Sequence, residues 1–292
     1  VSAFITSVGN WLTFIATALL IGEKFGASNV AFAFLIQCLP PILVSHKVHA
    51  WLKPYKKVYV FAVLEVLAAL NVSSLIFSQD LIHIYIYLFI AAFIRTINNP
   101  IFNSFIGDWV PENELQSAFT QIGGVSSFTL MLAPVVGGFI ATQFGYSTLF
   151  IVDAMTFLLA VFVLAPWPSV SNKKVFIQNN NKLKSHFFIL PKFNKPLNKV
   201  LYIWFLLILV GALLNALEFP LLFERKLSKI DIGIALGFWG AGSFLAFIRV
   251  KLKKPIPLQK MFLLFFFSMG IFILTKNFVM ICVAFLLGGF SN

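Results

Sequence analysis

The feature that most restricts the fold of this chain is a succession of ten apolar stretches, most of them long enough to cross a lipid bilayer. A helix needs about 20 apolar residues to cross a hydrocarbon core of roughly 30 Å. The chain is 60% hydrophobic and only 11% charged, which is far outside the usual composition of soluble domains. The sequence therefore predicts an all-α membrane protein with spans at 1–22, 29–50, 57–77, 81–106, 116–142, 146–166, 200–223, 232–248, 258–275 and 277–292.

Basic residues lie mostly in the connections that follow the even-numbered spans. Four lysines follow the second span, seven follow the sixth and five basic residues follow the eighth, sixteen in all, whereas the other connections hold five. Such an excess of lysine and arginine marks the cytoplasmic side of a membrane protein. The net charge of +12 thus predicts an orientation in the membrane, and it gives no reason to expect nucleic-acid binding.

The longest polar segment, 167–199, separates six spans from the four that follow. It is lysine-rich and interrupted by proline, and we expect a cytoplasmic linker that buries little apolar surface. This arrangement predicts a six-helix N-terminal bundle at 1–166 and a C-terminal bundle at 200–292 that holds only helices 7–10. Similar halves with a ligand site between them are a common plan of transporters.

The fifth span contains "LMLAPVVGGFI", residues 130–140, in which proline and two glycines interrupt an apolar helix. Small residues recur there every four positions, at Thr129, Ala133, Gly137, Ala141 and Gly145. In lipid, a ridge of small residues lets a neighbouring helix approach closely, and proline and glycine are tolerated where helices pack tightly. The ridge is either a static packing seam or a seam that moves during transport.

The same stretch resembles the antiporter signature G-x-x-x-G-P-x-x-G-G of major facilitator superfamily exporters. Pro134, Gly137 and Gly138 match it, and Thr129 and Ala133 replace two glycines with other small residues. "GDWVPENELQSAFTQIGG", "GYSTLFIVDAMTFLLA" and the opening "SVGNWLTFIATALL" resemble the branch that contains macrolide-efflux proteins and the enterobactin exporter. The resemblance implies twelve helices in two bundles that rock about a central cavity and export small molecules, usually against proton entry. This chain would then lack helices 11 and 12.

One loop departs from the pattern of that family. Between helices 2 and 3 the family carries G-x-x-x-D-R-x-G-R-R, whereas this chain has "VHAWLKPYKK". Val48 replaces the glycine and Leu52 replaces the aspartate, while the basic residues Lys53, Lys56 and Lys57 remain. In the family the aspartate helps to latch the two halves together, and Leu52 has no charge with which to do so. The three lysines are gating candidates, together with the proline and glycines of the fifth span.

Ionisable residues inside the spans are candidates for transport and coupling, because a charge at mid-helix costs about 2.5–3.5 kcal/mol on insertion scales. Arg95 in the fourth span and Glu65 in the third lie at similar depths and are a candidate ion pair. The family places an arginine near this point of helix 4 and links it to proton coupling, and Arg95 matches it. Glu218 is either a protonatable cavity residue or an interfacial carboxylate. Asp153 in the sixth span is expected to be structural.

Polar residues on the first and fourth spans are candidates for lining a cavity. Asn10, Thr13 and Thr17 form a stripe on the first span, which lines the cavity in the family. Asn99 lies one turn beyond Arg95 on the fourth span. The alternative for the two threonines is that their hydroxyls bond to their own helix backbone.

Other kinds of site are not indicated by the sequence. His46 and His49 in "HKVH" have no third metal ligand nearby. No serine, cysteine and histidine set for nucleophilic catalysis can be assembled. We therefore expect no enzyme, no metal and no cofactor. The expected partners are a small-molecule substrate, protons and the lipid bilayer, around a monomer in the bacterial inner membrane.

Together these observations predict a proton-coupled secondary transporter, an antiporter that exports a drug-like or siderophore-like molecule. One alternative is a lipid or lysolipid flippase, which could use the same bundles. A second is a truncated remnant that transports nothing, suggested by the missing helices and by Leu52.

The predicted topology can be tested at the linker. In a cysteine-free background, a cysteine placed at Asn180 is expected to react with membrane-impermeant thiol reagents only from the cytoplasmic side, because lysine-rich segments remain there. Labelling of intact cells and of inverted vesicles measures this. Labelling from the periplasmic side would contradict the topology.

Overall fold

The computed structural model describes residues 2–52, 56–77, 79–164, 201–202, 211, 216–252 and 257–291. The predicted linker at 167–199 and the gating candidate Lys53 lie outside these residues. Within the described part of the chain the structure is helical and contains no strand. The elements are α1 (Ser2–Phe25), α2 (Ala27–Leu52), α3 (Lys57–Phe77), α4 (Leu81–Trp109), the 3-10 turn η1 (Glu112–Glu114), α5 (Leu115–Gln143), α6 (Tyr146–Leu164), α8 (Lys229–Lys251), α9 (Leu258–Leu274) and α10 (Phe278–Ser291).

The helices coincide with the predicted membrane spans. Seven of them, α1–α6 and α8, are long and apolar enough to cross a membrane, and α9 and α10 are apolar but shorter. The seventh predicted span, 200–223, is described only in part, and its residues 216–224 are helical. The prediction of an all-α membrane protein is therefore confirmed.

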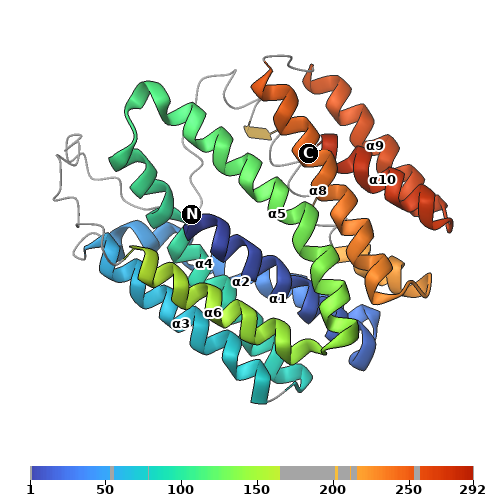
Figure 1. Ribbon diagram of the computed structural model, residues 1–292, viewed down its shortest axis with the longest axis horizontal. Helices are drawn as coiled ribbons and strands as arrows, with labels where there is room; N and C mark the ends of the chain where they lie inside the picture. The colour runs from blue at the N-terminus through green and yellow to red at the C-terminus, as the bar shows by residue number, and fades with distance from the viewer. Residues whose placement is uncertain are drawn as a thin grey trace.

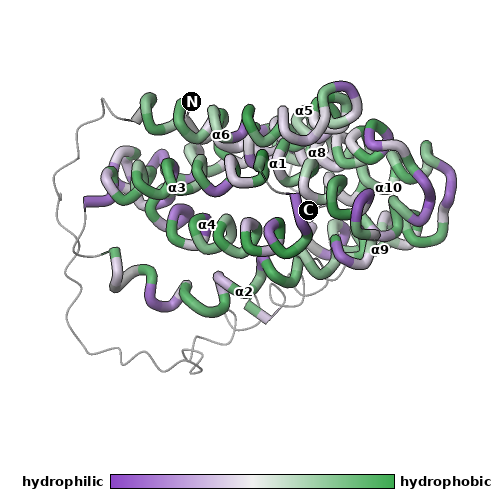
Figure 2. The backbone as a smooth tube through the Cα atoms, turned by 90° about the horizontal axis from the view of Figure 1, so that it is seen from below, coloured by the Kyte–Doolittle hydropathy of each residue, from purple (hydrophilic) through white to green (hydrophobic). Residues whose placement is uncertain are grey.

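Large apolar side chains cover the outside of the molecule. Phe77 is 89% exposed, Leu274 86% and Ile42 65%, and hydrophobic residues recur along the helices in Figure 2. In water this surface would strongly favour aggregation. In lipid it faces a solvent of its own polarity, and the backbone polar groups are satisfied within the helices.

The helices form two groups that meet along α5 (Figure 1). α1–α4 and α6 pack together as one bundle, and α8–α10 form the second group. α5 packs against α1 on one side and against α8 on the other. The α2–α3 and α4–α5 connections lie at the end that the sequence predicts to be cytoplasmic. The α1–α2, α3–α4 and α5–α6 connections lie at the opposite end, which we call the outer end.

The contact between α5 and α8 depends on glycine in both helices. A Cβ on Gly138 of α5 would lie 2.5 Å from the carbonyl oxygen of Lys229. On α8, a Cβ on Gly233 would overlap the carbonyl of Pro134. The α8 glycines that meet the α5 backbone are Gly233, Gly237 and Gly240. This close approach of two backbones, here called the α5–α8 seam, joins the two groups of helices.

The predicted ridge on the fifth span faces α1 instead of α8. Thr129, Ala133 and Ala141 are buried, and a Cβ on Gly137 would lie 2.6 Å from a methyl carbon of Ile15. Gly145 does not belong to the ridge, because it lies in the turn after α5 with a φ of 80°, which glycine adopts without strain.

The two adjacent glycines of the signature therefore have different partners. Gly138 contacts the backbone of Lys229 in the neighbouring group of helices, whereas Gly137 packs against α1 of the same bundle. The reason is geometric, since consecutive residues of a helix point about 100° apart. A ridge at four-residue spacing and the residue beside it necessarily face different helices.

The α5–α8 seam predicts which glycine tolerates a larger side chain. Gly138→Val is expected to lower the unfolding free energy by about 1–3 kcal/mol, the usual cost of overpacking, because its side chain would meet the Lys229 backbone. Gly123→Val on the same helix is the control, since a Cβ there meets nothing within 4 Å. Thermal unfolding of the detergent-purified variants measures the difference. Equal melting temperatures for the two variants would contradict the seam.

Candidate functional site

A cavity of about 750 Å³ lies inside the bundle formed by α1–α6. Its lining reaches Phe4 of α1, Val110 after α4 and Ala118 of α5, all near the predicted cytoplasmic end. On α1 and α3 it stops at Thr17 and Asn71, short of the outer end of each helix. The cavity thus extends from the middle of the bundle toward the predicted cytoplasmic end.

An ion pair joins the two groups of helices at the outer end. Lys229 Nζ at the start of α8 lies 2.9 Å from Glu23 Oε2 of α1. The Tyr146 hydroxyl of α6 donates to the same carboxylate at 2.5 Å, and the Lys229 ammonium lies 4.7 Å from the centre of the Tyr146 ring. We call Glu23, Tyr146 and Lys229 the outer latch. It closes the end of the molecule that the cavity does not reach.

An aromatic cluster lies between the outer latch and the cavity. The ring of Phe219 is fully buried, and its centre lies 5.9 Å from that of Phe14 and 6.1 Å from that of Phe34. Residues 216–224 thereby pack against α1 and α2. Glu218 in this segment is half-buried and does not belong to the cavity lining among the described residues.

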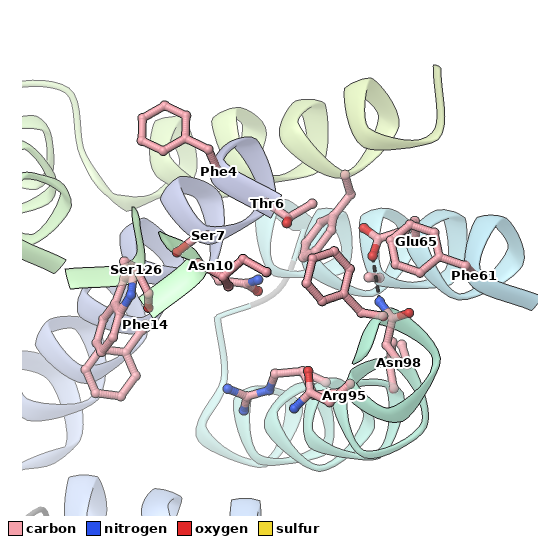
Figure 3. A pocket seen from close by; sticks show the side chains of 18 of the residues that line it. Phe4, Thr6, Ser7, Asn10, Phe14, Phe61, Glu65, Arg95, Asn98 and Ser126 are labelled. Atoms are coloured by element: carbon pink, nitrogen blue, oxygen red, sulfur yellow. Dashed lines mark hydrogen bonds between the residues drawn. The ribbon is translucent and has the colours of Figure 1, made fainter. Parts of the chain in front are cut away.

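Arg95 projects from α4 into the cavity (Figure 3). Its guanidinium Nη2 donates to the Gln37 side-chain oxygen of α2 at 2.7 Å. The side chain is solvent-accessible, which for a residue inside the bundle means that it faces the open cavity. Arg95 therefore holds a positive charge at the cavity surface, with a neutral amide as its hydrogen-bond partner.

Glu65 lies on a different part of the cavity wall, on α3. It is only 2% exposed, and its Oε1 accepts a hydrogen bond from the Asn98 side chain at 2.6 Å, drawn in Figure 3. Its other oxygen, Oε2, has no hydrogen-bond partner among the described residues. The two ion pairs of the described residues are Lys57–Asp108 and Lys229–Glu23, so the candidate pair of Arg95 with Glu65 is not formed.

The polar stripe predicted on the first span divides between two environments. Asn10 and Thr17 line the cavity, as does Asn99 on α4. Thr13 does not, because it is turned into the helix packing and is only 3% exposed. The Thr17 hydroxyl donates to the backbone oxygen of Thr13 at 2.8 Å, which is the backbone bonding considered as the alternative for these residues.

The basic gating candidates that are described bond within their own bundle. Lys57 at the start of α3 forms an ion pair with Asp108 of α4 at 2.8 Å and also donates to Ser104. The Lys56 ammonium lies 5.8 Å from the centre of the Tyr59 ring. The two contacts of Lys57 tie α3 to α4 at the predicted cytoplasmic end.

Asp153 of α6 lies behind the cavity wall and is 1% exposed. Its Oδ1 accepts a hydrogen bond from Thr156 at 3.3 Å. A Cβ on Gly9 of α1 would overlap this carboxylate, so the glycine makes room for it. Asp153 does not belong to the cavity lining.

The sequence reasoning missed the amides that hold the charged groups. Gln37 and Asn98 both lie inside apolar spans, where the rule that singled out Arg95 would also have flagged them as costly polar groups. It also missed Glu23 and Lys229, which look like ordinary charges at span ends. Among the described residues, no group of three histidine, cysteine or acidic side chains could hold a metal ion.

Sequence comparison relates the chain to membrane transporters. The whole chain, residues 1–292, matches the family model of the Major Facilitator Superfamily. The curated "Uncharacterized MFS-type transporter YfiS" of Bacillus subtilis (strain 168) is 23% identical over 182 residues, which cover 62% of this chain and 43% of that protein. The chain thus spans less than half the length of this curated relative.

Solved structures with the same fold cover almost the entire chain. The nucleoside transporter NupG (D323A mutant) has a TM-score of 0.69 at 14% identity, over 99% of this chain and 79% of its own. A bacterial homologue of the human lysosomal transporter Spinster, inward-facing and unoccupied, has a TM-score of 0.65 at 14% identity, and the match covers 99% of this chain and 71% of that one. An inward-facing bacterial homologue of the iron transporter ferroportin has a TM-score of 0.65 at 16% identity, and the match covers 100% of this chain and 80% of that one.

The outer latch and the cavity make a prediction about access. With the exposed native Cys38 changed to serine, a cysteine at Asn10 is expected to react only with reagent from the cytoplasmic side. Adding Glu23→Gln removes an exposed ion pair worth about 0.2–1 kcal/mol, so labelling from the outer side should rise by up to roughly fivefold. The control is Glu112→Gln, an exposed acid outside the latch. An unchanged rate with Glu23→Gln would contradict the latch.

Proposed function

This chain belongs to the Major Facilitator Superfamily, and from that membership we propose that it is a secondary transporter that exports a small, drug-like or siderophore-like molecule in exchange for protons. The observation that carries the proposal is the cavity of about 750 Å³, whose largely apolar wall also holds polar and charged side chains such as Arg95 and Glu65. A volume of this order suits a small-molecule site. The resemblance of several motifs to macrolide-efflux proteins and the enterobactin exporter supports export within this family.

The orientation proposed here places the cavity mouth in the cytoplasm. The excess of basic residues in the even-to-odd connections supports it. The outer latch and the α5–α8 seam lie on the side away from the mouth. Two of the structural relatives are described as inward-facing, and a cavity with this position fits such a state. The proposed location is the bacterial inner membrane, with the 167–199 linker in the cytoplasm.

The α5–α8 seam is the proposed moving contact between the two groups of helices. Its backbones touch through glycine at Gly138, Gly233 and Gly240, while aromatic side chains meet nearer the predicted cytoplasmic end, at Phe128 and Phe244. The glycine part of this contact can separate with little rearrangement of side chains, because there are few rotamers to change. We propose that the seam and the outer latch open together when the cavity closes to the cytoplasm. In this proposal Gly138 lies at the moving contact, whereas Gly137 packs against α1 within the bundle and does not take part in the movement.

Arg95 and Glu65 are the proposed coupling residues. Both line the cavity, and neither forms an ion pair with another of the described residues. A buried charge without a partner is costly, so a proton or a charged substrate that neutralises it is bound with a large gain in free energy. Glu65, with one oxygen free of hydrogen bonds, is the group that can take up and release the proton. Glu218 is a secondary candidate.

Arg95 provides the test of this coupling. In inverted vesicles and with a compound that the wild type transports, Arg95→Ala is expected to abolish proton-driven accumulation while downhill exchange partly survives. Arg95→Lys is also expected to fail, because an ammonium lacks the planar fork of a guanidinium. Arg249→Ala, an exposed arginine near the end of α8, is the control for loss of a positive charge. Normal accumulation by Arg95→Ala would refute the coupling role.

A further inference from the structure

The cavity contains one positive and one negative side chain that do not neutralise each other. All ten acidic residues of the chain lie in the described part, and the ion pairs given between described residues are Lys57–Asp108 and Lys229–Glu23. Arg95 is bonded to the amide of Gln37. Glu65 is bonded to the amide of Asn98. Each charge is thus held in place by a neutral group, and its charge remains available to a ligand.

Both side chains have unused hydrogen-bonding capacity that points to a ligand. A guanidinium has five N–H donors, and the contact with Gln37 occupies one of them. Glu65 is only 2% exposed, and no described residue donates a hydrogen bond to its Oε2. An unsatisfied buried carboxylate oxygen is expensive. A ligand with a hydrogen-bond donor at that point would remove the cost.

The remaining acid of the bundle interior does not compensate Arg95 at the cavity surface. Asp153 is 1% exposed, lies behind the wall and accepts a hydrogen bond from Thr156. It does not belong to the cavity lining, whereas Glu65 does. The groups that a ligand meets are therefore Arg95 and Glu65.

We propose that the cavity binds a zwitterion, with its anionic group at Arg95 and its ammonium at Glu65. A singly charged anion would leave the Glu65 oxygen unsatisfied, and a singly charged cation would leave Arg95 without a counter-charge. Arg95 and Asn98, which holds Glu65, are three residues apart on α4, and such positions lie about 5–6 Å apart at Cβ. Small zwitterions such as an amino acid or a phosphocholine group carry both charges and are the ligand classes to test.

This assignment rests on the proposed function and explains how exchange could operate. An ammonium and a proton compete for the same carboxylate oxygen, because only the ionised carboxylate attracts the ammonium and only the neutral one holds the proton. Binding of one therefore excludes the other at Glu65, which is the condition for exchange of substrate against protons. Rings such as Phe61 and Phe102, which also line the cavity, would pack against the apolar part of the ligand.

The test compares ligands that share a scaffold and carry different charges. Binding to the purified full chain is measured by thermal stabilisation, which reports affinity through mass action. The first series is phenylalanine, the cation phenylalaninamide and the anion N-acetylphenylalanine. The second is lysophosphatidylcholine and the anion lysophosphatidic acid. The zwitterion of at least one series is expected to bind on the order of tenfold more tightly than its singly charged analogues, since one charged hydrogen bond is worth about that much.

Two variants assign each charge to its residue. Glu65→Gln is expected to abolish the preference for phenylalanine over N-acetylphenylalanine. Arg95→Gln is expected to abolish the preference for phenylalanine over phenylalaninamide. Glu112→Gln and Arg249→Gln remove exposed charges outside the cavity and should leave both preferences intact. A preference in the first series alone identifies a free solute, and one in the second alone identifies a lipid headgroup.

If a variant does not fold, the binding of the two ligand series to the wild-type protein still tests the zwitterion assignment. Equal binding of charged and zwitterionic analogues in both series, or binding of neither zwitterion, overturns the inference. Neither result affects the proposed transport of another small molecule. Conversely, a wild type that binds the zwitterion selectively but moves no proton in vesicles would refute proton-coupled export and leave the binding assignment standing.

Discussion

Close contact between helix backbones is the interaction on which the rest of this structure depends. In lipid the hydrophobic effect does not press helices together, so association relies on packing and on polar contacts. Glycines in α5 and α8 let the two backbones touch, and this contact holds the two groups of helices together. Toward the predicted cytoplasmic end the contact continues through aromatic side chains, with the Phe128 and Phe244 ring centres 5.7 Å apart. The cavity is lined by α1–α6 and not by α8.

The cavity wall holds charged side chains within a bundle that is otherwise largely apolar. The wall residues Arg95 and Glu65 each bond to an amide, and the amides come from helices that pack against their own. An amide orients a charged side chain without neutralising it, whereas an ion pair would have removed the charge from use. Glu65 is buried, so its uncompensated charge carries a desolvation cost, whereas Arg95 faces the open cavity. In the proposed complex, a ligand that supplies the opposite charges would recover that cost as binding free energy.

Polar contacts at the two ends of the molecule have different consequences. At the predicted cytoplasmic end, Lys57 bonds Asp108 inside one bundle, so this ion pair does not oppose separation of the two groups. At the outer end, Lys229 bonds Glu23 between the groups. The family latch that Leu52 cannot form would have joined the halves at the cytoplasmic end. Between the described residues, the ion pair that joins the two groups of helices thus lies at the outer end.

The sequence by itself determined the spans, because length and apolar character decide whether a helix crosses lipid, and it identified the small-residue ridge and the polar residues inside the spans. It did not determine their partners. Gly137 and Gly138 look equivalent in the sequence, yet one packs against α1 and the other against α8. Similar depth made Arg95 and Glu65 a candidate pair, but Asn98 holds Glu65. Depth follows from counting residues along one helix, whereas a hydrogen-bond partner depends on the rotation of two helices about their axes, and only tertiary packing fixes that rotation.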